Sequence, residues 1–273
     1  MRRLARRILG TAPAYGAWTR VHGRSGLVFV LGCGRSGTHW LGHILASHPD
    51  VAATVEKPAL FDLVTRMALD PRTRPALFPE LVRRYRREHL AVLPRWYADK
   101  SHPNLWLAED LARAFPRARF VAIQRGPHAT VASMLVHKGV LSWHRRWREF
   151  PVPNRFLGIS VEEAPTYDSL PAAVKCALRW RSHAEETARL EGALPERLLL
   201  VRYEALIRET WDQLRRLQQF LGLEQPFPTP PVQADSLDRW RTQLTPEQVS
   251  QIDAVVGGTA GAAGAAASTR EWP

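Results

Sequence analysis

The sequence predicts an α/β protein with a P-loop-type three-layer fold, in which helices flank a central parallel sheet. Short apolar runs at Leu27 to Leu31, Arg119 to Gln124 and Arg197 to Val201 are typical of strands covered on both faces. Helical patterns separate these runs, and such an alternation of strands and helices gives a parallel sheet. Ligands bind beyond the carboxyl ends of such strands, so we expect a site in the turns that follow them.

The first of these strands leads into a glycine-rich loop. Gly32, Gly34 and Gly37 follow Leu31, and apolar residues then recur at the spacing of one helix face. A strand, a glycine-rich loop and a helix together present backbone N–H groups and a helix N-terminus to a phosphate. The segment therefore predicts a phosphate site, and the alternative is an ordinary strand-to-helix turn.

This loop differs from a Walker A motif, which requires the pattern G-x-x-x-x-G-K-[ST]. Gly32 and Gly37 keep the glycine spacing, but Thr38 stands at the lysine position. His39 stands where the hydroxyl that binds magnesium should be, and the cation has moved inside the loop to Arg35. The pattern favours a nucleotide donor that needs no metal over ATP, and we predict no metal site.

Length, charge and cysteine content limit the number of domains, the kind of partner and the cellular compartment that the sequence allows. A chain of 273 residues forms one large domain, or one domain with a subdomain. The formal net charge of +12 implies anionic partners: a nucleotide, a sulfated or phosphorylated substrate, nucleic acid or a membrane surface. Two cysteines, Cys33 and Cys176, cannot build a disulfide framework, which suits a reducing compartment and predicts a cytoplasmic protein.

We place the domain at residues 25–256, between two ends of different composition. Residues 1–24 are basic but contain no long apolar core, so we expect neither a signal peptide nor a membrane span there. We favour a solvated N-terminus over weak contact with an anionic membrane surface. Residues 257–273 are rich in glycine and alanine and are predicted to be a disordered tail.

Further patterns complete the predicted domain. Residues 140–170 are rich in tryptophan and proline, and we expect this irregular insertion to act as a lid or substrate insertion at the ligand edge. A short strand is predicted at Val51 to Val55 and a linker at Pro226 to Pro231. Helices are predicted at Leu60 to Leu69, Leu81 to Leu93, Leu105 to Phe115, Ala129 to His137, Ala172 to Leu190, Leu206 to Leu221 and Pro246 to Val255.

Five segments, in this order, resemble one family. They are GCGRSGTHWL, HPDVAATVEKP, DKSHPNLWLAEDLARAFPRARFVAIQRGPHATVASM, VRYEAL and DRW, and they extend from about Leu27 to Trp240. On these segments the chain resembles sulfotransferases that use 3′-phosphoadenosine 5′-phosphosulfate (PAPS). It is most similar to the protein-tyrosine sulfotransferase-like branch and its soluble microbial-type members. The resemblance implies transfer of the sulfuryl group from PAPS, as co-substrate, to an acceptor hydroxyl, with 3′,5′-ADP as product.

The resemblance also implies which residues bind the donor. In chain order they are Arg35, Ser36, Gly37, Thr38, His39, Arg125, Ser133, Tyr203 and Arg239. The first five match the family's loop for the 5′-phosphosulfate, with His39 where a second threonine is usual. Arg125 and Ser133 match the pair that holds the 3′-phosphate, and a guanidinium with a hydroxyl can clamp a phosphate that ATP lacks. Arg239 stands where the branch has a late lysine.

Three catalytic residues follow from the same resemblance. Glu56 matches the general base of the tyrosyl branch, which lies 21 residues after the loop arginine and just past a His-Pro pair. Lys100 matches a lysine in a short turn before the second nucleotide segment. Negative charge builds on the leaving oxygen during such transfers, so Lys100 and Arg35 would stabilise it. Glu56 would take the proton of the acceptor hydroxyl.

Several points stay open at this stage. The acceptor is a small molecule, a glycan or a peptide, because the hydroxyl of a tyrosine or other phenol, of a sugar or of a lipid would each suit a carboxylate base. His137 occupies the place of a further arginine of the branch, with Lys138 beside it, and their contact with the nucleotide is undecided. The sequence does not decide the oligomeric state.

Three other classes compete with a sulfotransferase. A P-loop nucleotide-dependent kinase would explain the loop, but the loop lacks the lysine and the magnesium hydroxyl. A nucleic-acid-binding protein would explain the charge, but the basic residues are dispersed and form no recognisable module, so we expect no specific nucleic-acid partner. A nucleotide-binding protein without catalysis is the third alternative.

Overall fold

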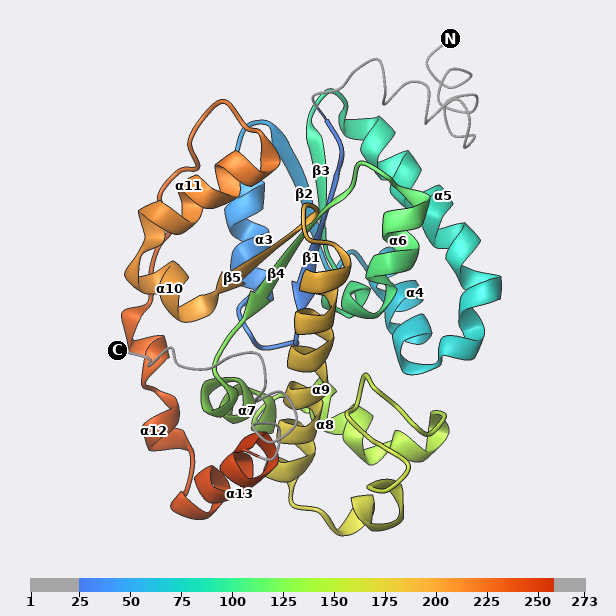
Figure 1. Ribbon diagram of the computed structural model, residues 1–273, viewed down its shortest axis with the longest axis vertical. Helices are drawn as coiled ribbons and strands as arrows, with labels where there is room; N and C mark the ends of the chain where they lie inside the picture. Colours follow the sequence, from blue (N-terminus) through green and yellow to red (C-terminus); the bar gives the residue numbers. More distant parts are fainter. Residues whose placement is uncertain (1–24, 258–273) are drawn as a thin grey trace. The chain divides into compact units, whose positions relative to one another are not determined.

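The computed structural model describes residues 25–257, which contain a parallel sheet of five strands in the order β2-β3-β1-β4-β5 (Figure 1). The strands are β1 (Leu27–Gly32), β2 (Val51–Val55), β3 (Trp96–Lys100), β4 (Arg119–Gln124) and β5 (Leu198–Arg202). Helices cover both faces of this sheet. The arrangement confirms the predicted α/β class with a central parallel sheet flanked by helices.

Strand β1 is the centre of the sheet. All six of its residues are buried, and it pairs with β3 on one side and with β4 on the other. Phe29 stacks on Phe120 with ring centroids 5.6 Å apart and meets the Tyr85 ring edge-on at 4.9 Å. Full burial of such a side chain stabilises a fold by roughly 1.5–3 kcal/mol, so the continuous apolar run of β1 fixes the strand inside the sheet.

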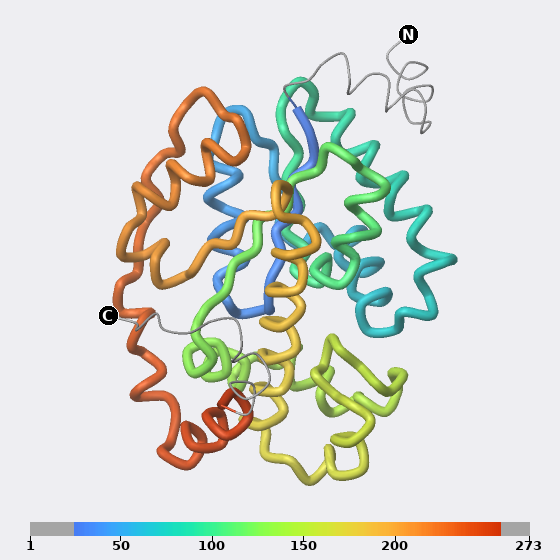
Figure 2. Tube along the Cα trace, viewed as in Figure 1, coloured from blue at the N-terminus to red at the C-terminus, as the bar shows by residue number. Residues whose placement is uncertain are grey.

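Two groups of helices form the outer layers (Figures 1 and 2). On one face lie α3 (Thr38–Ser47), α10 (Tyr203–Arg208) and α11 (Thr210–Leu221). On the other lie α4 (Pro58–Leu69), α5 (Arg74–Val92) and α6 (Ala108–Ala114), with the short 3-10 helices η1 (Pro71–Thr73) and η2 (His102–Leu107). Since α3 directly follows β1, its N-terminus lies at the carboxyl edge of the sheet.

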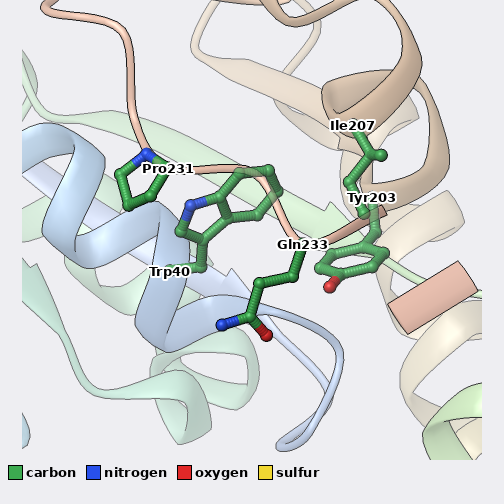
Figure 3. A pocket seen from close by; sticks show the side chains of 5 residues that line it. All are labelled: Trp40, Tyr203, Ile207, Pro231 and Gln233. Carbon is green, nitrogen blue, oxygen red and sulfur yellow. The ribbon is translucent and has the colours of Figure 1, made fainter. Parts of the chain in front are cut away.

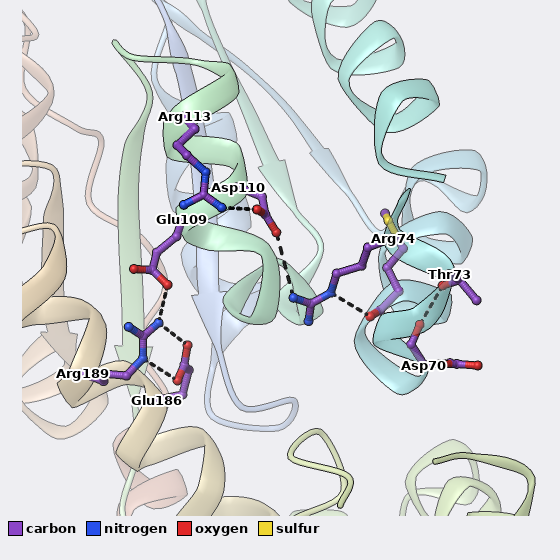
Figure 4. A network of polar contacts seen from close by, with 9 residues as sticks. Asp70, Thr73, Arg74, Glu109, Asp110, Arg113, Glu186 and Arg189 are labelled. Atoms are coloured by element: carbon purple, nitrogen blue, oxygen red, sulfur yellow. Dashed lines mark hydrogen bonds and ion pairs between the residues drawn. The ribbon is translucent and has the colours of Figure 1, made fainter. Parts of the chain in front are cut away.

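Ion pairs join the helices of the second face (Figure 4). Arg74 of α5 lies 3.9 Å from Asp110 of α6 and donates a hydrogen bond to the Met67 carbonyl of α4. Arg189 binds Glu109 of α6 at 2.7 Å. Partly exposed pairs of this kind each contribute about 0–1 kcal/mol, so they orient α6 more than they stabilise the fold.

The described residues divide into two compact units, one of residues 25–125 with 186–234 and one of residues 126–185 with 235–257. The sheet belongs to the first unit. The second unit contains α7 (Pro127–Leu135), α8 (Lys138–Arg145), η3 (Trp147–Glu149), η4 (Ala164–Ser169), α12 (Trp240–Gln243) and α13 (Pro246–Gly257). Helix α9 (Ala172–Ala193) begins in the second unit and ends in the first, and η5 (Ala234–Leu237) lies at the other boundary.

Inside the second unit, one buried arginine and one stacked histidine hold the helices together. The Arg179 guanidinium lies between the rings of Trp143 and Phe156, at 5.1 and 4.4 Å. The His128 ring stacks on Trp240 at 4.7 Å, and its Nε2 lies 2.9 Å from a carboxylate oxygen of Asp253. The contacts of His128 join α7 to α12 and α13.

Most predicted elements are present, and three differ. Strand β3 had no predicted counterpart, because Lys100 was placed in a turn. The helix predicted from Leu105 to Phe115 is divided into η2 and α6, and the helix predicted from Leu206 to Leu221 is interrupted at Glu209. There Thr210 turns its hydroxyl back to the Leu206 carbonyl at 2.9 Å. Such a side-chain bond competes with the regular helix ladder.

The predicted basic segment of residues 1–24 and all but the first residue of the predicted tail lie outside the described residues. Within residues 25–257, no helix has the length and apolar character needed to cross a membrane.

Candidate active site

The carboxyl ends of all five strands deliver the predicted residues of the first unit. These are the glycine-rich loop after β1, Glu56 after β2, Lys100 at the end of β3, Arg125 after β4 and Tyr203 after β5. Because the strand order is β2-β3-β1-β4-β5, Glu56 and Lys100 fall on one side of the loop. Arg125 and Tyr203 fall on its other side. The sheet thus separates the predicted catalytic pair from the predicted nucleotide clamp.

The loop has a backbone that its glycines make possible. Gly37, the residue before α3, has φ +92°, and a Cβ there would lie 2.4 Å from a ring carbon of Tyr203. Gly32 has φ +142°, and its Cβ would lie 2.5 Å from the Ile123 carbonyl oxygen. Arg35 is also left-handed, with φ 79°. A non-glycine residue in that region costs on the order of 1–3 kcal/mol, which is typical of functional loops.

A cavity of about 250 Å³ joins the loop to the strand end of β4. It is lined by Arg35, Gly37, Thr38, His39, Trp40, Arg125 and Tyr203. Arg35 and Arg125 therefore face one space although they follow different strands. Two guanidiniums and the N-terminus of α3 make this cavity suited to an anion with more than one phosphate-like group.

Aromatic contacts hold Arg125 in place. Its guanidinium carbon lies 4.5 Å from the centre of the Tyr203 ring, within the range of a cation–π contact. The Tyr203 ring meets Trp40 edge-on, with centroids 5.6 Å apart. Tyr203 thus contacts Arg125 through its ring face and Trp40 edge-on, and it lies beside Gly37 of the loop.

A second cavity, of about 210 Å³, shares Trp40 and Tyr203 with the first (Figure 3). Ile207, Pro231 and Gln233 complete its lining. Figure 3 shows the Trp40 indole between Pro231 and the Tyr203 ring, with the Gln233 amide beside them. Flat apolar walls and one amide with a donor and an acceptor suit a heteroaromatic base. Trp40 is one of the apolar residues expected on one face of the helix after the loop, and Gln233 was not among the predicted site residues.

Glu56 is surrounded by cationic or polar nitrogen groups. It has φ 47°, and its backbone N–H donates to the Lys100 carbonyl at 2.9 Å. Lys100 Nζ donates to Oε1, His102 Nδ1 lies 3.4 Å from Oε1, and His39 Nε2 lies 3.5 Å from Oε2. Burial raises the pKa of the carboxyl, but hydrogen bonds from His102 and Lys100 outweigh it and lower the pKa to about 2. Glu56 is therefore a carboxylate at neutral pH.

Lys100 is almost fully buried, with 1% of its side chain exposed. Its Nζ binds Glu56 and donates to His39 Nδ1 at 2.9 Å. Burial lowers the pKa of the ammonium, and the neighbouring carboxylates of Glu56 and Asp99 counteract that effect. A buried cation next to the phosphate loop can stabilise developing negative charge more strongly than one in water.

Asp99 lies beneath this pair in a buried network that the sequence did not reveal. The Tyr85 hydroxyl, the Asn104 amide and the Thr54 hydroxyl donate to its carboxylate at 2.8, 2.9 and 3.2 Å. Burial raises the pKa of Asp99 to about 6, against the effect of these hydrogen bonds. The network fixes the end of β3 and so the position of Lys100.

His102 is the other polar residue near Glu56 that the sequence reasoning missed. It begins η2, and a Cβ on Gly34 of the loop would lie 3.0 Å from His102 Nε2. The sequence offers a signal for the strand before it: between Pro94 and Pro103, the aromatic residues Trp96 and Tyr97 precede a polar run that ends at His102.

Two predicted donor-binding residues belong to the second unit. Ser133 is half-buried on α7, and Arg239 precedes α12 and forms an ion pair with Asp235. His137, whose role was undecided, caps α8 by accepting a hydrogen bond from the Val140 N–H at 3.2 Å. The roles of Ser133 and Arg239 toward a nucleotide stay predictions.

Known proteins of one kind resemble this chain. The sequence model of the Sulfotransferase family matches residues 28–227. Nodulation protein NoeE of Sinorhizobium fredii is 25% identical over 277 residues, covering 85% of this chain and 64% of NoeE. A putative protein-tyrosine sulfotransferase of Caenorhabditis briggsae is 24% identical over 209 residues, covering 72% of this chain and 66% of that protein. The chain therefore spans about two thirds of the length of these curated relatives.

The fold agrees with this match. The sulfotransferase domain from the curacin biosynthetic pathway superposes with a TM-score of 0.53 at 17% identity, covering 85% of this chain and 98% of that domain. The family match includes all five strands except the first residue of β1, together with the loop, Glu56, Lys100, Arg125 and Tyr203. The resemblance found in the sequence is thereby confirmed at the level of the family: the chain belongs to the Sulfotransferase family.

Proposed function

We propose that the protein transfers the sulfuryl group of PAPS to an acceptor hydroxyl and releases 3′,5′-ADP. The observation that carries this proposal is the position of Arg35 and Arg125 on one cavity, with Glu56 and Lys100 at the adjacent strand ends. PAPS carries anionic groups at both its 3′ and 5′ positions, so two separate guanidiniums in one cavity match its charges. Family membership supports the same chemistry.

The parts of the donor can be assigned to parts of the site. Arg35 and the N–H groups of the loop and of α3 would hold the 5′-phosphosulfate. Arg125, held on the Tyr203 ring, would bind the 3′-phosphate. The adenine would occupy the cavity of Trp40, Tyr203 and Gln233, because glutamine presents the donor and acceptor that match the N6 and N7 atoms of adenine. Substitution of Ser133 and Arg239 would test their predicted contact with the 3′-phosphate.

The reaction would proceed in line. The acceptor oxygen forms a bond to sulfur while the bond between sulfur and the 5′-phosphate oxygen breaks, and Glu56 takes the hydroxyl proton. Arg35 and Lys100 stabilise the charge on the leaving 5′-phosphate. Because Lys100 binds Glu56 in the structure, it must turn toward the donor as the reaction begins. The carboxylate then loses one of its hydrogen bonds and becomes a stronger base.

We also propose that the donor binds without a metal ion, since the loop has neither the Walker lysine nor a hydroxyl at the magnesium position. For the acceptor, the proposal includes more than one class of hydroxyl compound. One relative is named a putative protein-tyrosine sulfotransferase, and a phenol with a pKa of about 10 gives up its proton more readily than an alcohol. A phenol or tyrosine hydroxyl is therefore our first choice, and sugar and small-molecule hydroxyls are the next.

The test is direct. The full chain is incubated with PAPS and separate panels of phenols, tyrosine peptides, sugars and lipids, and both 3′,5′-ADP and sulfated product are measured. We expect product with at least one panel, and its loss in Glu56→Gln with 3′,5′-ADP binding retained. Binding of 3′,5′-ADP with no transfer to any panel would indicate a nucleotide-binding protein instead. Tighter stabilisation by ATP–Mg²⁺ than by 3′,5′-ADP would indicate a kinase.

A further inference from the structure

His39, Lys100 and Glu56 form a group in which each side chain contacts the other two. Its Nδ1 is 2.9 Å from Lys100 Nζ, its Nε2 is 3.5 Å from Glu56 Oε2, and Lys100 in turn donates to Glu56 Oε1. His39 is the second residue of α3, Lys100 is the last residue of β3, and Glu56 directly follows β2. The imidazole is half exposed, with 51% of the side chain accessible, and also lines the cavity that holds Arg35 and Arg125.

The contact with Lys100 determines the tautomer of the ring. An ammonium group has donors and no acceptor, so Nδ1 must offer its lone pair to Lys100. In the neutral ring the proton is then on Nε2, which faces the Glu56 carboxylate. The ring therefore accepts from the ammonium through one nitrogen and presents an N–H to the carboxylate through the other.

We propose that His39 is a positioning residue, in addition to its place in the glycine-rich loop region. It holds the ammonium of Lys100 and the carboxylate of Glu56 in the positions that sulfuryl transfer requires. A threonine at this position would carry a single oxygen on Cβ, nearer the backbone than either ring nitrogen of His39. When Lys100 turns toward the donor, the Nε2–H of His39 stays directed at Oε2 of Glu56. Oε1, still 3.4 Å from His102 Nδ1, then loses its bond from Lys100 and can take the acceptor proton. This role deepens the proposed sulfuryl transfer and rests on it.

The charges around His39 favour the neutral ring that this role requires. Burial lowers the pKa of His39, the positive charges of Lys100 and Arg35 and the nearby His43 lower it further, and Glu56 opposes them. His102, at the start of η2, faces the same carboxylate at 3.4 Å. A proton on Nδ1 would place two positive groups against each other and remove the hydrogen bond to Lys100. We therefore expect protonation of His39 to reduce kcat on the acid side.

The first test needs neither donor nor acceptor. Histidine-labelled full-length protein is studied by long-range ¹H–¹⁵N NMR, with His39→Gln used to assign the His39 signals. We expect the Nε2–H tautomer at neutral pH and titration below the ordinary value of 6.5. In Lys100→Met we expect a mixed tautomer population, since the ammonium that fixes it is gone. A dominant Nδ1–H tautomer in the wild type, or titration above 6.5, would overturn the proposal.

The second test separates positioning from phosphate binding. His39→Leu should lower kcat by about 10- to 100-fold, as expected for misplaced catalytic groups. Its affinity for 3′,5′-ADP, measured by calorimetry, should stay within about threefold. His39→Gln, whose amide can accept from Lys100 and donate to Glu56, should recover most of kcat. His43→Leu, on the same helix and exposed, is the matched control and should leave kcat unchanged at neutral pH, where the His39 ring is already neutral.

The outcomes of the two tests are distinguishable. If His39→Leu weakens 3′,5′-ADP binding and leaves kcat unchanged at saturating PAPS, His39 is a phosphate ligand and the positioning role is wrong. If the acid limb of the kcat profile is the same in the wild type and in His39→Leu, the role is also wrong. If the wild type transfers no sulfuryl group at all, the proposed function fails, while the NMR experiment still decides the geometry of His39.

Discussion

The guanidinium of Arg125 rests on the ring face of Tyr203, with 4.5 Å between the guanidinium carbon and the ring centre. The two residues directly follow neighbouring parallel strands, β4 and β5, and the pairing of those strands brings them together. The ring limits the orientations of the arginine side chain before any ligand binds. Less side-chain entropy is then lost when a phosphate is bound.

This contact predicts a difference between two substitutions of Tyr203. Tyr203→Leu should weaken 3′,5′-ADP binding by about 2- to 30-fold, the equivalent of a cation–π contact of about 0.5–2 kcal/mol. Tyr203→Phe keeps the ring face and should stay within about twofold of the wild type. Isothermal titration calorimetry measures both. Equal losses in the two variants would mean that the hydroxyl, and not the ring, is the part that matters.

Glu56 is expected to be essential for turnover and dispensable for donor binding. Glu56→Gln removes the carboxylate that takes the acceptor proton, so kcat should fall by about 10²- to 10⁴-fold. Its amide keeps a similar shape, so the affinity for 3′,5′-ADP should change by less than about threefold. Initial rates with saturating PAPS, together with calorimetry, check the two statements. A retained kcat would show that another group is the base.

The low pKa of Glu56 should depend on Lys100. In the wild type, burial raises this pKa, but the bonds from His102 and Lys100 lower it to about 2. In Lys100→Met the Lys100 bond and its positive charge are lost, so the pKa should rise toward its ordinary value of 4.5. Carboxyl ¹³C NMR of the full-length protein measures it. An unchanged pKa would mean that His102 alone determines it.

Gly37 should tolerate no side chain. Gly37→Ala places a Cβ 2.4 Å from a carbon of Tyr203 at φ +92°, so we expect a loss of about 1–3 kcal/mol in the free energy of unfolding. Gly192→Ala is the matched control, because it lies in helix α9 and its added Cβ would meet no atom within 4 Å apart from its chain neighbours and the backbone of its own helix. Alanine there should be neutral or stabilise by up to about 1 kcal/mol. Urea unfolding of both variants tests the pair, and equal effects would contradict the steric account.

Asp99 should make stability depend on pH. Burial raises its folded pKa to about 6 from an ordinary value of 3.8, so between these values the folded state binds more protons than the unfolded one. Its contribution to the free energy of unfolding must then decrease as pH rises from about 4 to about 6. Asp99→Asn cannot titrate, so relative to the wild type it should be more stable at about pH 7 than at about pH 4.5. Thermal unfolding measures the difference, and a pH-independent difference would mean that Asp99 stays charged in the fold.

Much of the fold could be predicted because its strands are continuous apolar runs. β2 and β4 have the bounds that the sequence indicates, and β1 is one residue longer. Gly32 and Gly37 mark the loop because a backbone with positive φ excludes most other residues. Since the carboxyl ends of parallel strands share one edge, Arg35 and Arg125 were expected at the same edge, and they line one cavity.

Strand β3 escaped prediction because its burial depends on distant partners. It ends in two charged residues, Asp99 and Lys100, which a local pattern places in solvent or in a turn. They are buried because Tyr85 and Asn104 bind the aspartate and Glu56 binds the lysine. These partners come from other elements, so no spacing rule within the segment could indicate them.

The contact of His39 with Lys100 and Glu56 escaped prediction for the same reason. The resemblance gives this position to the donor-binding loop, and the side chain, besides lining the cavity of Arg35 and Arg125, contacts two residues from neighbouring strands. The neighbouring cavity of Trp40 and Gln233 likewise combines α3 with a segment almost 200 residues later. Such sites follow from the order of the strands in the sheet, which a single sequence does not show.

The central claim is that one cavity binds both phosphate groups of a doubly phosphorylated adenosine. Calorimetry of the full-length protein with 3′,5′-ADP and with 5′-AMP, in a buffer without divalent metal, tests it most directly. We predict that 3′,5′-ADP binds at least about tenfold more tightly, as one charge-assisted phosphate contact allows, and that Arg125→Ala removes most of this difference. Equal affinities of the wild type for the two nucleotides would contradict the account.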